Sequence, residues 1–233
     1  MRWRGWATAA VLIVLALAGT YRLQRSRTFQ LFGELVPRVE TRDSVVALTF
    51  DDGPSDRAGE LLDFLRAERV SATFYLVGSG VGEHPDVARR LVADGHELGN
   101  HTFHHRRMVL RSPSYVRREV ERTDSAIRAA GFAGPITFRP PYCQKLVGLP
   151  LYLARTGRVT VTWDVEPESF PEVAGDSAAT VRHVLERVRP GSIILLHPWY
   201  RSGEGTRRAV PAIVAGLRAR GYRFVTVAEL RRR

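Results

Sequence analysis

Residues 44–54 read SVVALTFDDGP, a run of apolar and β-branched residues that ends in two adjacent aspartates and a turn. Valine, threonine and phenylalanine favour extended backbone, and the Gly-Pro pair favours a sharp turn. The stretch therefore predicts a buried strand with Asp51 and Asp52 at its carboxyl end. Because neighbouring side chains on an extended segment point in different directions, one aspartate can bind a metal ion while the other faces a water molecule. A turn with two solvated carboxylates is the alternative interpretation.

Similar short apolar runs recur along the chain and alternate with amphipathic stretches. The further strands that we expect are residues 72–77, 96–99, 136–139, 159–164, 192–196 and 223–227. The helices expected between them are residues 59–69, 85–93, 114–130, 178–188 and 207–218, with apolar side chains three to four positions apart. The alternation is typical of an α/β fold of repeated strand–helix units, and the strand number favours a barrel. In such a barrel the chemistry lies at the carboxyl ends of the strands.

Composition limits the possible organisation and partners. A chain of 233 residues with 44% hydrophobic content suits one catalytic domain with an appendage. The only cysteine, Cys143, excludes an intramolecular disulfide and a cysteine-rich zinc site. An excess of 35 basic over 24 acidic residues favours polyanionic partners such as phospholipid headgroups or envelope polymers. Nucleic acid is not expected, because the arginines form no stripe interleaved with aromatic residues, and the oligomeric state is left open.

The N-terminus has the pattern of an export segment. Arg2 and Arg4 precede an apolar run over residues 5–20, and Arg22 resumes the basic charge. Such a run with basic flanks is typical of a signal peptide or a signal anchor. Cleavage near the small residues of Ala16-Leu17-Ala18 and a retained anchor are both open, and we favour the anchor.

Three regions are therefore predicted. Residues 1–27 are the signal peptide or signal anchor with basic flanks, and residues 28–43 are a linker, with or without a short docking segment. Residues 44–233 are the catalytic domain, which we expect outside the cytoplasm, either membrane-anchored or secreted. The membrane, contacted through the N-terminal segment, is an expected partner.

Three histidines follow the strand expected at residues 96–99. His101 and His105 are four residues apart, and on a helical turn they would meet on one face and bind one divalent ion. His104 between them is ambiguous, and we place it next to the site or on the surface. With Asp52 the pair forms a two-histidine, one-carboxylate ligand set. Zn²⁺ fits these ligands, with Co²⁺, Ni²⁺ or Fe²⁺ as alternatives, and such an ion acidifies water and polarises a carbonyl.

Two further strand ends carry groups that suit acyl chemistry. Arg139 precedes two prolines that stiffen the loop, and the backbone N–H of Tyr142 can donate to a developing oxyanion. His197 ends the strand at residues 192–196 and is suited to protonating a leaving amine. The aromatic Trp199 beside it suits stacking against a sugar face.

Taken together, the motifs TFDDGP, HTFHH, RPPY and LLH, in this order, resemble the polysaccharide deacetylase family, also called the NodB-homology family or carbohydrate esterase family four. The resemblance covers residues 44–230, and four motifs in the right order are highly specific. It implies a distorted (β/α) barrel of about seven strands. It also implies a hydrolase that acts on carbon–nitrogen bonds other than peptide bonds and releases acetate from N-acetylated sugars.

The resemblance also assigns roles to individual residues. It implies that the base is Asp51, the metal ligands are Asp52, His101 and His105, the arginine positioning the base is Arg139, the oxyanion donor is Tyr142, and the general acid is His197. A substrate groove is expected from Pro141, Tyr142, Phe170 and Trp199.

One motif departs from the family pattern. Family members commonly carry an Asp-Trp pair after the fifth strand, whose acid orients the general-acid histidine. Ser169 and Phe170 stand at those positions here. The apolar wall is kept by Phe170, but the carboxylate is lost unless Asp164, Glu166 or Glu168 substitutes for it.

Three functions follow as hypotheses. The first is removal of acetyl groups from an N-acetylglucosamine-type glycan such as peptidoglycan or a surface polysaccharide. The second is a catalytically impaired, glycan-binding pseudoenzyme, which the altered motif would favour. The third is hydrolysis of a small non-sugar amide on the same scaffold.

Overall fold

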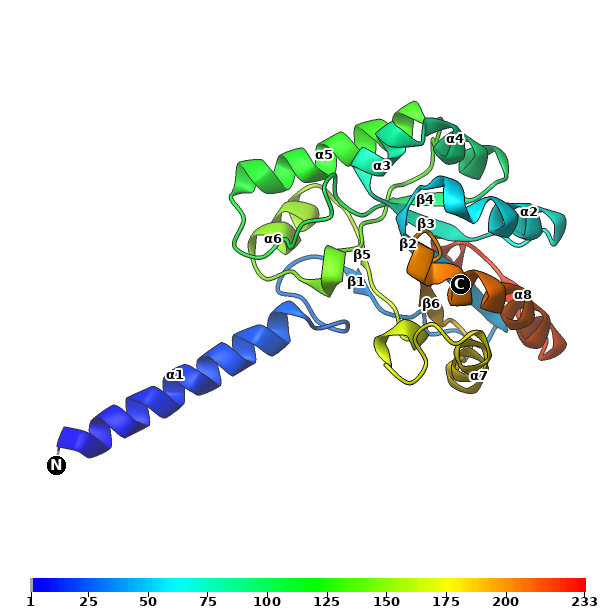
Figure 1. The fold of residues 1–233 in the computed structure, drawn as a ribbon. Helices are drawn as coiled ribbons and strands as arrows, with labels where there is room; N and C mark the ends of the chain where they lie inside the picture. The colour runs from blue at the N-terminus through cyan, green and yellow to red at the C-terminus, as the bar shows by residue number, and fades with distance from the viewer. Residues whose placement is uncertain (1) are drawn as a thin grey trace.

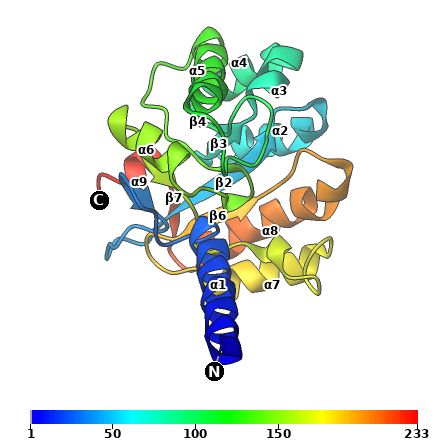
Figure 2. The same cartoon turned by 90° about the vertical axis from the view of Figure 1, so that its left-hand side faces the viewer.

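The structure is a computed structural model that describes residues 2–233, without the side chains of residues 2–5 and 7–9. A long helix, α1 (Arg2–Gln24), projects from a domain in which parallel strands are surrounded by helices (Figures 1 and 2). The predicted α/β fold with a parallel sheet is therefore confirmed.

The strand β2 (Val45–Gly53), which carries the two aspartates, is the centre of the sheet. The strand order is β4-β3-β2-β6, with β3 (Thr73–Leu76), β4 (Glu97–Asn100) and β6 (Ile193–Leu196) all parallel to their neighbours. The short strand β7 (Arg223–Phe224) pairs with the beginning of β2. Eight of the nine residues of β2 are buried, as expected for a strand covered on both faces.

Single-residue bridges close this sheet toward a distorted barrel. Residues 136–139 were expected to form a strand, but only Phe138 pairs there, with Asn100 on one side and Thr160 on the other. The prediction of a full strand was wrong because prolines stand on both sides of this segment, and proline cannot donate to a strand ladder. A further bridge joins Val165 to Ile194 of β6.

Helices cover the sheet at positions close to those predicted. The predicted helices are α2 (Gly59–Ala67), α4 (Pro85–Ala93), α5 (Pro113–Ala129), α7 (Ser177–Arg187) and α8 (Glu204–Ala219). Those not predicted are α3 (Gly78–Glu83), α6 (Gly148–Arg155), α9 (Val227–Leu230) and the 3₁₀ turns η1 (Asp56–Ala58), η2 (Pro141–Cys143), η3 (Pro167–Ser169) and η4 (Arg201–Gly203). The sequence of α3, GSGVGE, is rich in glycine and so has little helix propensity of its own.

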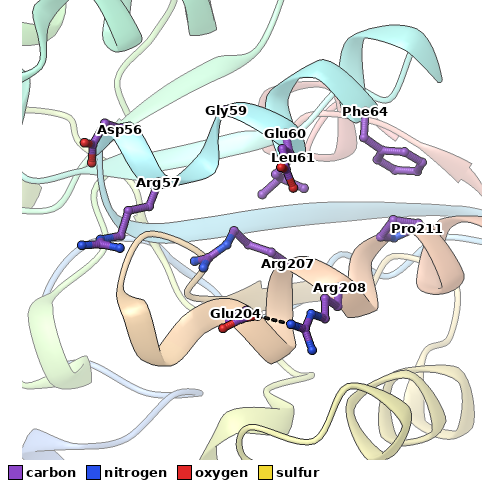
Figure 3. A pocket seen from close by; sticks show the side chains of 10 residues that line it. All are labelled: Asp56, Arg57, Gly59, Glu60, Leu61, Phe64, Glu204, Arg207, Arg208 and Pro211. Carbon is purple, nitrogen blue, oxygen red and sulfur yellow. Dashed lines mark hydrogen bonds and ion pairs between the residues drawn. The ribbon is translucent and has the colours of Figure 1, made fainter.

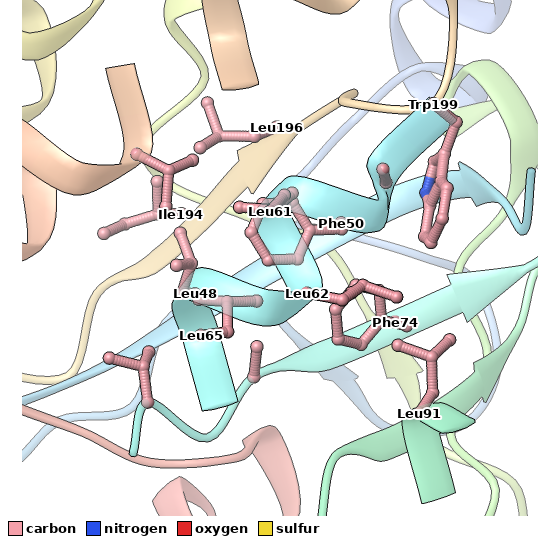
Figure 4. Packing of buried hydrophobic residues seen from close by; sticks show 14 of the residues in the cluster. Leu48, Phe50, Leu61, Leu62, Leu65, Phe74, Leu91, Ile194, Leu196 and Trp199 are labelled. Atoms are coloured by element: carbon pink, nitrogen blue, oxygen red, sulfur yellow. The ribbon is translucent and has the colours of Figure 1, made fainter. Parts of the chain in front are cut away.

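The main hydrophobic core lies between the strands and α2. Leu48 and Phe50 of β2 pack with Phe74 of β3, whose ring centroid lies 5.0 Å from that of Phe50, and α2 covers them with Leu61 and Leu65 (Figure 4). Burying large apolar side chains stabilises a fold by about 1.5–3 kcal/mol each. This packing holds β2 rigidly, and with it the two aspartates at its end.

Residues 28–43, which were expected to be a linker, pack against the domain. They include β1 (Leu35–Val36), which pairs in parallel with β5 (Thr160–Val161). Further along, the N–H of Val39 donates to the carbonyl oxygen of Gly191 at 3.1 Å. This region therefore contains the docking segment that the sequence left open, while the predicted domain boundaries stay predictions.

Apolar side chains from Val11 to Leu15 and at Leu17 on α1 are exposed to solvent. No helix in the described part of the chain is both long enough and apolar enough to cross a membrane. The predicted membrane segment falls partly on residue 1 and on side chains outside the described residues.

The contact of residues 38–41 with the domain predicts a difference between two glycine substitutions. Gly95 and Gly191 have φ angles of +80° and +79°, so an alanine is strained at either position. A Cβ at Gly95 meets nothing within 4 Å, whereas at Gly191 it lies 1.8 Å from the Val39 carbonyl oxygen. We expect Gly95→Ala to cost about 1–2 kcal/mol of unfolding free energy and Gly191→Ala about 2 kcal/mol more, measured by urea denaturation. Equal losses would show that this segment does not dock in solution.

Candidate active site

The predicted catalytic groups meet at the carboxyl ends of the strands. Asp51 and Asp52 end β2, the histidines follow β4, and His197 follows β6. Their side chains line one open cavity of about 600 Å³. From the predicted set this cavity is lined by Asp51, Asp52, His101, His105, Tyr142 and His197, and the unpredicted residues in its wall include Arg25, Arg27, Trp163, Glu166 and Ser169.

Asp52, His101 and His105 form a group that can hold a metal ion. The Asp52 Oδ1 atom lies 3.0 Å from His105 Nε2 and 3.3 Å from His101 Nε2, and these ligand atoms lie within 4.8 Å of one another. Ligands about 2.0–2.2 Å from one shared ion would be separated by roughly 3 Å. Although the two imidazoles are close, Asp52 Oδ1 is buried and accepts no hydrogen bond of good geometry in the described residues. A buried oxygen facing two ring nitrogens in this way is suited to binding a cation.

The backbone around this group is locally strained. His101 and His105 were expected to meet on a helical turn, but the segment is not helical. Left-handed backbone at Thr102 (φ 67°) and His105 (φ 53°) folds the loop back instead, so the helical interpretation was wrong although the two rings do converge. Asp52 is also left-handed, with φ of 74°. Such conformations cost about 1–3 kcal/mol each in residues other than glycine and cluster at functional sites.

The charges of the group favour an ionised Asp52. Burial raises the pKa of this carboxyl, but the facing imidazoles of His101 and His105 outweigh burial and hold the pKa well below its usual range. His101 is oriented by its other nitrogen, because Nδ1 lies 2.7 Å from the carbonyl oxygen of Arg139. A carbonyl can only accept, so Nδ1 carries the proton and the Nε2 lone pair is directed toward Asp52.

The guanidinium of Arg139 holds Asp51 next to this group. Arg139 is 0% exposed and donates from Nη1 to Asp51 Oδ1 at 2.7 Å and to Thr49 Oγ1 at 2.8 Å. The second oxygen, Asp51 Oδ2, lies 3.7 Å from His101 Nε2. Asp51 is therefore fixed by one oxygen while the other faces the candidate metal ligands.

Glu168 supplies the carboxylate that the altered motif left in doubt. Its Oε2 atom lies 2.5 Å from His197 Nδ1, and its Oε1 atom accepts from the hydroxyl of Thr206. Burial alone would lower the pKa of His197, but the hydrogen bond and charge of Glu168, with the charges of Asp51 and Asp52, raise that pKa to about 9. Of the three substitutes considered from the sequence, Glu168 is the one that contacts His197.

Tyr142 stands at the mouth of the cavity. It has left-handed backbone with φ of 56°, the residue is 53% exposed, and its ring centroid lies 4.7 Å from that of His105. The hydrogen bonds of the turn use the N–H groups of Cys143 and Gln144 and not that of Tyr142. The Tyr142 amide is therefore available to an acceptor bound in the cavity.

Other predicted groove residues do not reach the cavity. Trp199 is only 2% exposed and lies in the core against Gly53 and Phe74, so it cannot stack on a sugar (Figure 4). Phe170 packs against His183 of α7 and is absent from the cavity wall. Both predictions of substrate contact are corrected. Trp199 is part of the hydrophobic core, and at the turn η3 it is Ser169, not Phe170, that lines the cavity.

Two more residues from the same motifs have structural surroundings. Pro141 is buried in the turn η2 and does not line the cavity. His104 points away from the candidate ligands and pairs with Glu119 of α5, Nδ1 to Oε1 at 2.6 Å. His104 is thus not part of the group that can hold a metal.

Several cavity residues were missed from the sequence. Trp163 lies 7% exposed in the wall and donates from Nε1 to Glu166 Oε2 at 2.8 Å. Arg25 and Arg27 were attributed to the basic flank of the export segment, and no local pattern connects them with strand ends more than twenty residues away.

A second cavity of about 620 Å³ lies between α2 and α8 (Figure 3). Its wall mixes both charges, including Arg57, Glu60 and the ion pair of Glu204 with Arg208. Histidine, serine and cysteine are absent from its lining residues, all of which are described. Although the two cavities are similar in size, among the described residues the groups suited to acyl chemistry converge on the other one.

Comparison with known proteins agrees with this geometry. Residues 38–170 match the family model described as polysaccharide deacetylase. The chain belongs to the polysaccharide deacetylase family. It is 35% identical to the chitooligosaccharide deacetylase of Bradyrhizobium sp. (strain ANU 289), over 79% of this chain and 90% of that protein. Its enzyme class is accordingly that of the N-deacetylases, which are hydrolases.

Solved structures of the family share the fold. The Bc1960 peptidoglycan N-acetylglucosamine deacetylase, crystallised with a hydroxamate-type benzamide, matches with a TM-score of 0.78 at 30% identity, over 84% of this chain and 92% of that chain. A mutant of BA3943, described as a CE4 family pseudoenzyme with restored enzymatic activity, matches with a TM-score of 0.76 at 26% identity, over 86% of this chain and 72% of that chain. The deacetylase fold therefore extends over the whole domain.

The candidate metal group predicts a split among the three neighbouring histidines. Changes next to a metal ligand typically cost roughly 10–100-fold in affinity, so His101→Ala and His105→Ala should weaken zinc binding by at least that much. His104→Ala is the matched control, because His104 pairs with Glu119, and it should keep the full metal content. Metal analysis after dialysis, with chelator competition, measures both. Full metal content in either ligand variant would reject the assignment.

The His197–Glu168 pair predicts a pH dependence. A general acid works in its protonated form, and His197, with its pKa raised to about 9, stays protonated at neutral pH and loses its proton as the pH rises through that value. Glu168→Gln removes the main stabilising charge, so the alkaline limb of kcat/KM should move down by at least about one pH unit, toward the ordinary histidine value near 6.5. Glu172→Gln, an exposed neighbour, should leave the limb in place. An unmoved limb in Glu168→Gln would exclude this role of the pair.

Proposed function

We propose that the protein hydrolyses the acetamide of N-acetylated sugars in an N-acetylglucosamine-type glycan, such as peptidoglycan or a surface polysaccharide, and releases acetate. The observation that carries the proposal is the convergence of a candidate metal group, a second carboxylate and a cationic histidine on one cavity. The activities named for its relatives, on chitooligosaccharide and on peptidoglycan N-acetylglucosamine, support the substrate class.

The candidate ligands fit Zn²⁺, with Co²⁺, Ni²⁺ or Fe²⁺ as alternatives, because all of these ions accept imidazole and carboxylate. Asp52, His101 and His105 would hold the ion, which would polarise the acetamide carbonyl and acidify the attacking water. The tautomer of His101, fixed by the Arg139 carbonyl, keeps Nε2 available as a ligand.

In the proposed reaction Asp51 is the base. Its carboxylate takes one proton from water as the water oxygen forms a bond to the acetamide carbon. Arg139 keeps Asp51 correctly placed through the 2.7 Å hydrogen bond to Oδ1. The negative charge that develops on the carbonyl oxygen is accepted by the free N–H of Tyr142.

His197 then acts as the acid. It donates its proton to the sugar nitrogen as the carbon–nitrogen bond breaks, which leaves a free amine on the sugar and acetate. Glu168 holds the imidazole through Nδ1, so the proton that is transferred is the one on Nε2. Intact acid, base and candidate ligands count against the pseudoenzyme hypothesis, which rested on the missing carboxylate.

The cellular location is also a proposal. We infer that the catalytic domain works outside the cytoplasm, either anchored through α1 or secreted after cleavage. The support is the apolar run over residues 5–20 between basic flanks, together with the exposed apolar side chains from Val11 to Leu17 on a helix that projects away from the domain (Figure 1).

Acetate release tests the proposed reaction. The zinc-loaded protein should liberate acetate from N-acetylated chito-oligomers or from peptidoglycan. Asp51→Asn removes the base and should slow release by about 10²–10⁴-fold while zinc stays bound. Asp56→Asn, an exposed residue of η1, is the control. Binding of the oligomers without acetate release from any of them would favour the pseudoenzyme, and turnover of small amides alone would favour the non-sugar hydrolase.

A further inference from the structure

The segment that follows α1 forms part of the wall of the catalytic cavity. Its backbone is held by three contacts. The N–H of Lys145 donates to the Gln24 carbonyl at 2.9 Å, the Lys145 amine to the Ser26 carbonyl at 2.5 Å, and the Thr162 hydroxyl to the Arg27 carbonyl at 2.6 Å. Residues 24–27 are therefore fixed on the domain and do not hang free.

The domain groups that hold this segment are themselves buried. Lys145 is 1% exposed and Thr162 is 0% exposed. A buried ammonium group needs acceptors, and the contacts of the Lys145 amine are the Ser26 carbonyl and the Cys143 sulfur at 3.9 Å. The Ser26 carbonyl is the closer of these two acceptors. Two buried polar groups of the domain therefore bond to the backbone of residues 26 and 27, which indicates a packed contact and not a chance approach of the chain to the surface.

The docked segment directs two arginines into the cavity. Arg25 and Arg27 line it together with the candidate metal ligands and Asp51. Arg27 Nη1 lies 3.3 Å from Glu166 Oε2, which also accepts a hydrogen bond from Trp163 Nε1. The side chain of Arg27 is 46% exposed. Because a guanidinium has five N–H donors, the contact with Glu166 leaves Arg27 able to bind a second acceptor.

Arg25 carries charge that no carboxylate offsets. Its guanidinium donates to the hydroxyl of Tyr21, a neutral group, and lies over the Tyr21 ring at 4.9 Å. No carboxylate among the described residues lies within ion-pair distance of it. In the same cavity the charge of Asp51 is balanced by Arg139. The wall formed by residues 24–27 is therefore cationic.

We propose that Arg25 and Arg27 form a subsite for an anionic group on the glycan, next to the acetamide that is hydrolysed. The inference rests on the proposed deacetylase function and narrows its substrate to glycans that carry a carboxylate or a phosphate on the same sugar or its neighbour. Guanidinium groups bind both kinds of anion through paired hydrogen bonds. The segment after the N-terminal helix thus selects the substrate.

The test uses the full-length, zinc-loaded protein and three N-acetylated oligomers of equal length. One is neutral chito-oligosaccharide, one carries lactyl carboxylates on alternate sugars, and one carries a phosphate on O6 of its terminal sugar. The wild type should prefer one or both anionic oligomers in kcat/KM at low salt. In the double variant Arg25→Gln and Arg27→Gln the ratio of anionic to neutral kcat/KM should fall about tenfold, mainly through KM. Which anionic arm loses preference identifies the anion.

The control removes the same charge elsewhere. Arg117 and Arg118 are exposed on α5 and do not line the cavity, so changing both to glutamine lowers the net charge equally but should leave the ratio unchanged. If the ratio of anionic to neutral kcat/KM fell equally in this control, the effect would be one of net charge, and the proposed subsite would be rejected. A wild type without anionic preference, or a double variant with the wild-type ratio, would also reject it.

Equilibrium binding of the same three oligomers separates this inference from the proposed reaction. Calorimetry on Asp51→Asn needs no turnover, and the anionic oligomers should bind more tightly than the neutral one by about tenfold. If acetate is never released but this preference holds and depends on the two arginines, the deacetylase function fails and the subsite stands. If acetate is released but the anionic and neutral oligomers bind with equal affinity, the subsite is rejected and the deacetylase function stands.

Discussion

The buried guanidinium of Arg139 is the interaction on which the geometry of the site depends. It has no solvent exposure, and desolvating such a cation costs several kcal/mol unless its donors are satisfied. Its donors reach Asp51 and Thr49 of β2 and the carbonyl oxygens of Val161 and Thr162, and the group lies 4.0 Å from the Tyr75 ring centroid. One side chain therefore connects β2 to the segment of β5, in a region where the bridges of a single residue, Phe138, replace a strand.

This constraint also separates the roles of two adjacent aspartates. The side chain of Arg139 donates to one oxygen of Asp51, and its backbone carbonyl accepts from Nδ1 of His101. Asp52 instead faces the histidines, because its backbone is left-handed. Strain at Asp52, Thr102, His105 and Tyr142 is offset by the packing of the strands beneath. The chemistry of the site thus depends on the rigid strand ends and on one buried ion pair.

Residues whose function follows from a strand end could be predicted from the sequence. Alternating apolar runs placed β2, β3, β4 and β6, and polar residues at the ends of β2, β4 and β6 line the cavity. The predictions that were wrong concern side chains whose position is decided by packing. Trp199 has a large apolar side chain that is buried in the core, although His197, two residues before it, lines the cavity.

Contacts between distant segments could not be predicted. Glu168 was one of three candidate partners of His197, and only the turn η3 selects it. Arg25 and Arg27 lie next to the export segment, so their charge had a sufficient explanation there. Their place in the cavity depends on Lys145 and Thr162, more than a hundred residues away in the chain.

A crystal structure of the protein with bound zinc would show directly which residues hold the ion. We expect an ion within about 2.0–2.2 Å of Asp52, His101 and His105, with Asp51 outside the coordination sphere and still hydrogen-bonded to Arg139. An ion ligated by Asp51, or one bound without either histidine, would contradict this expectation.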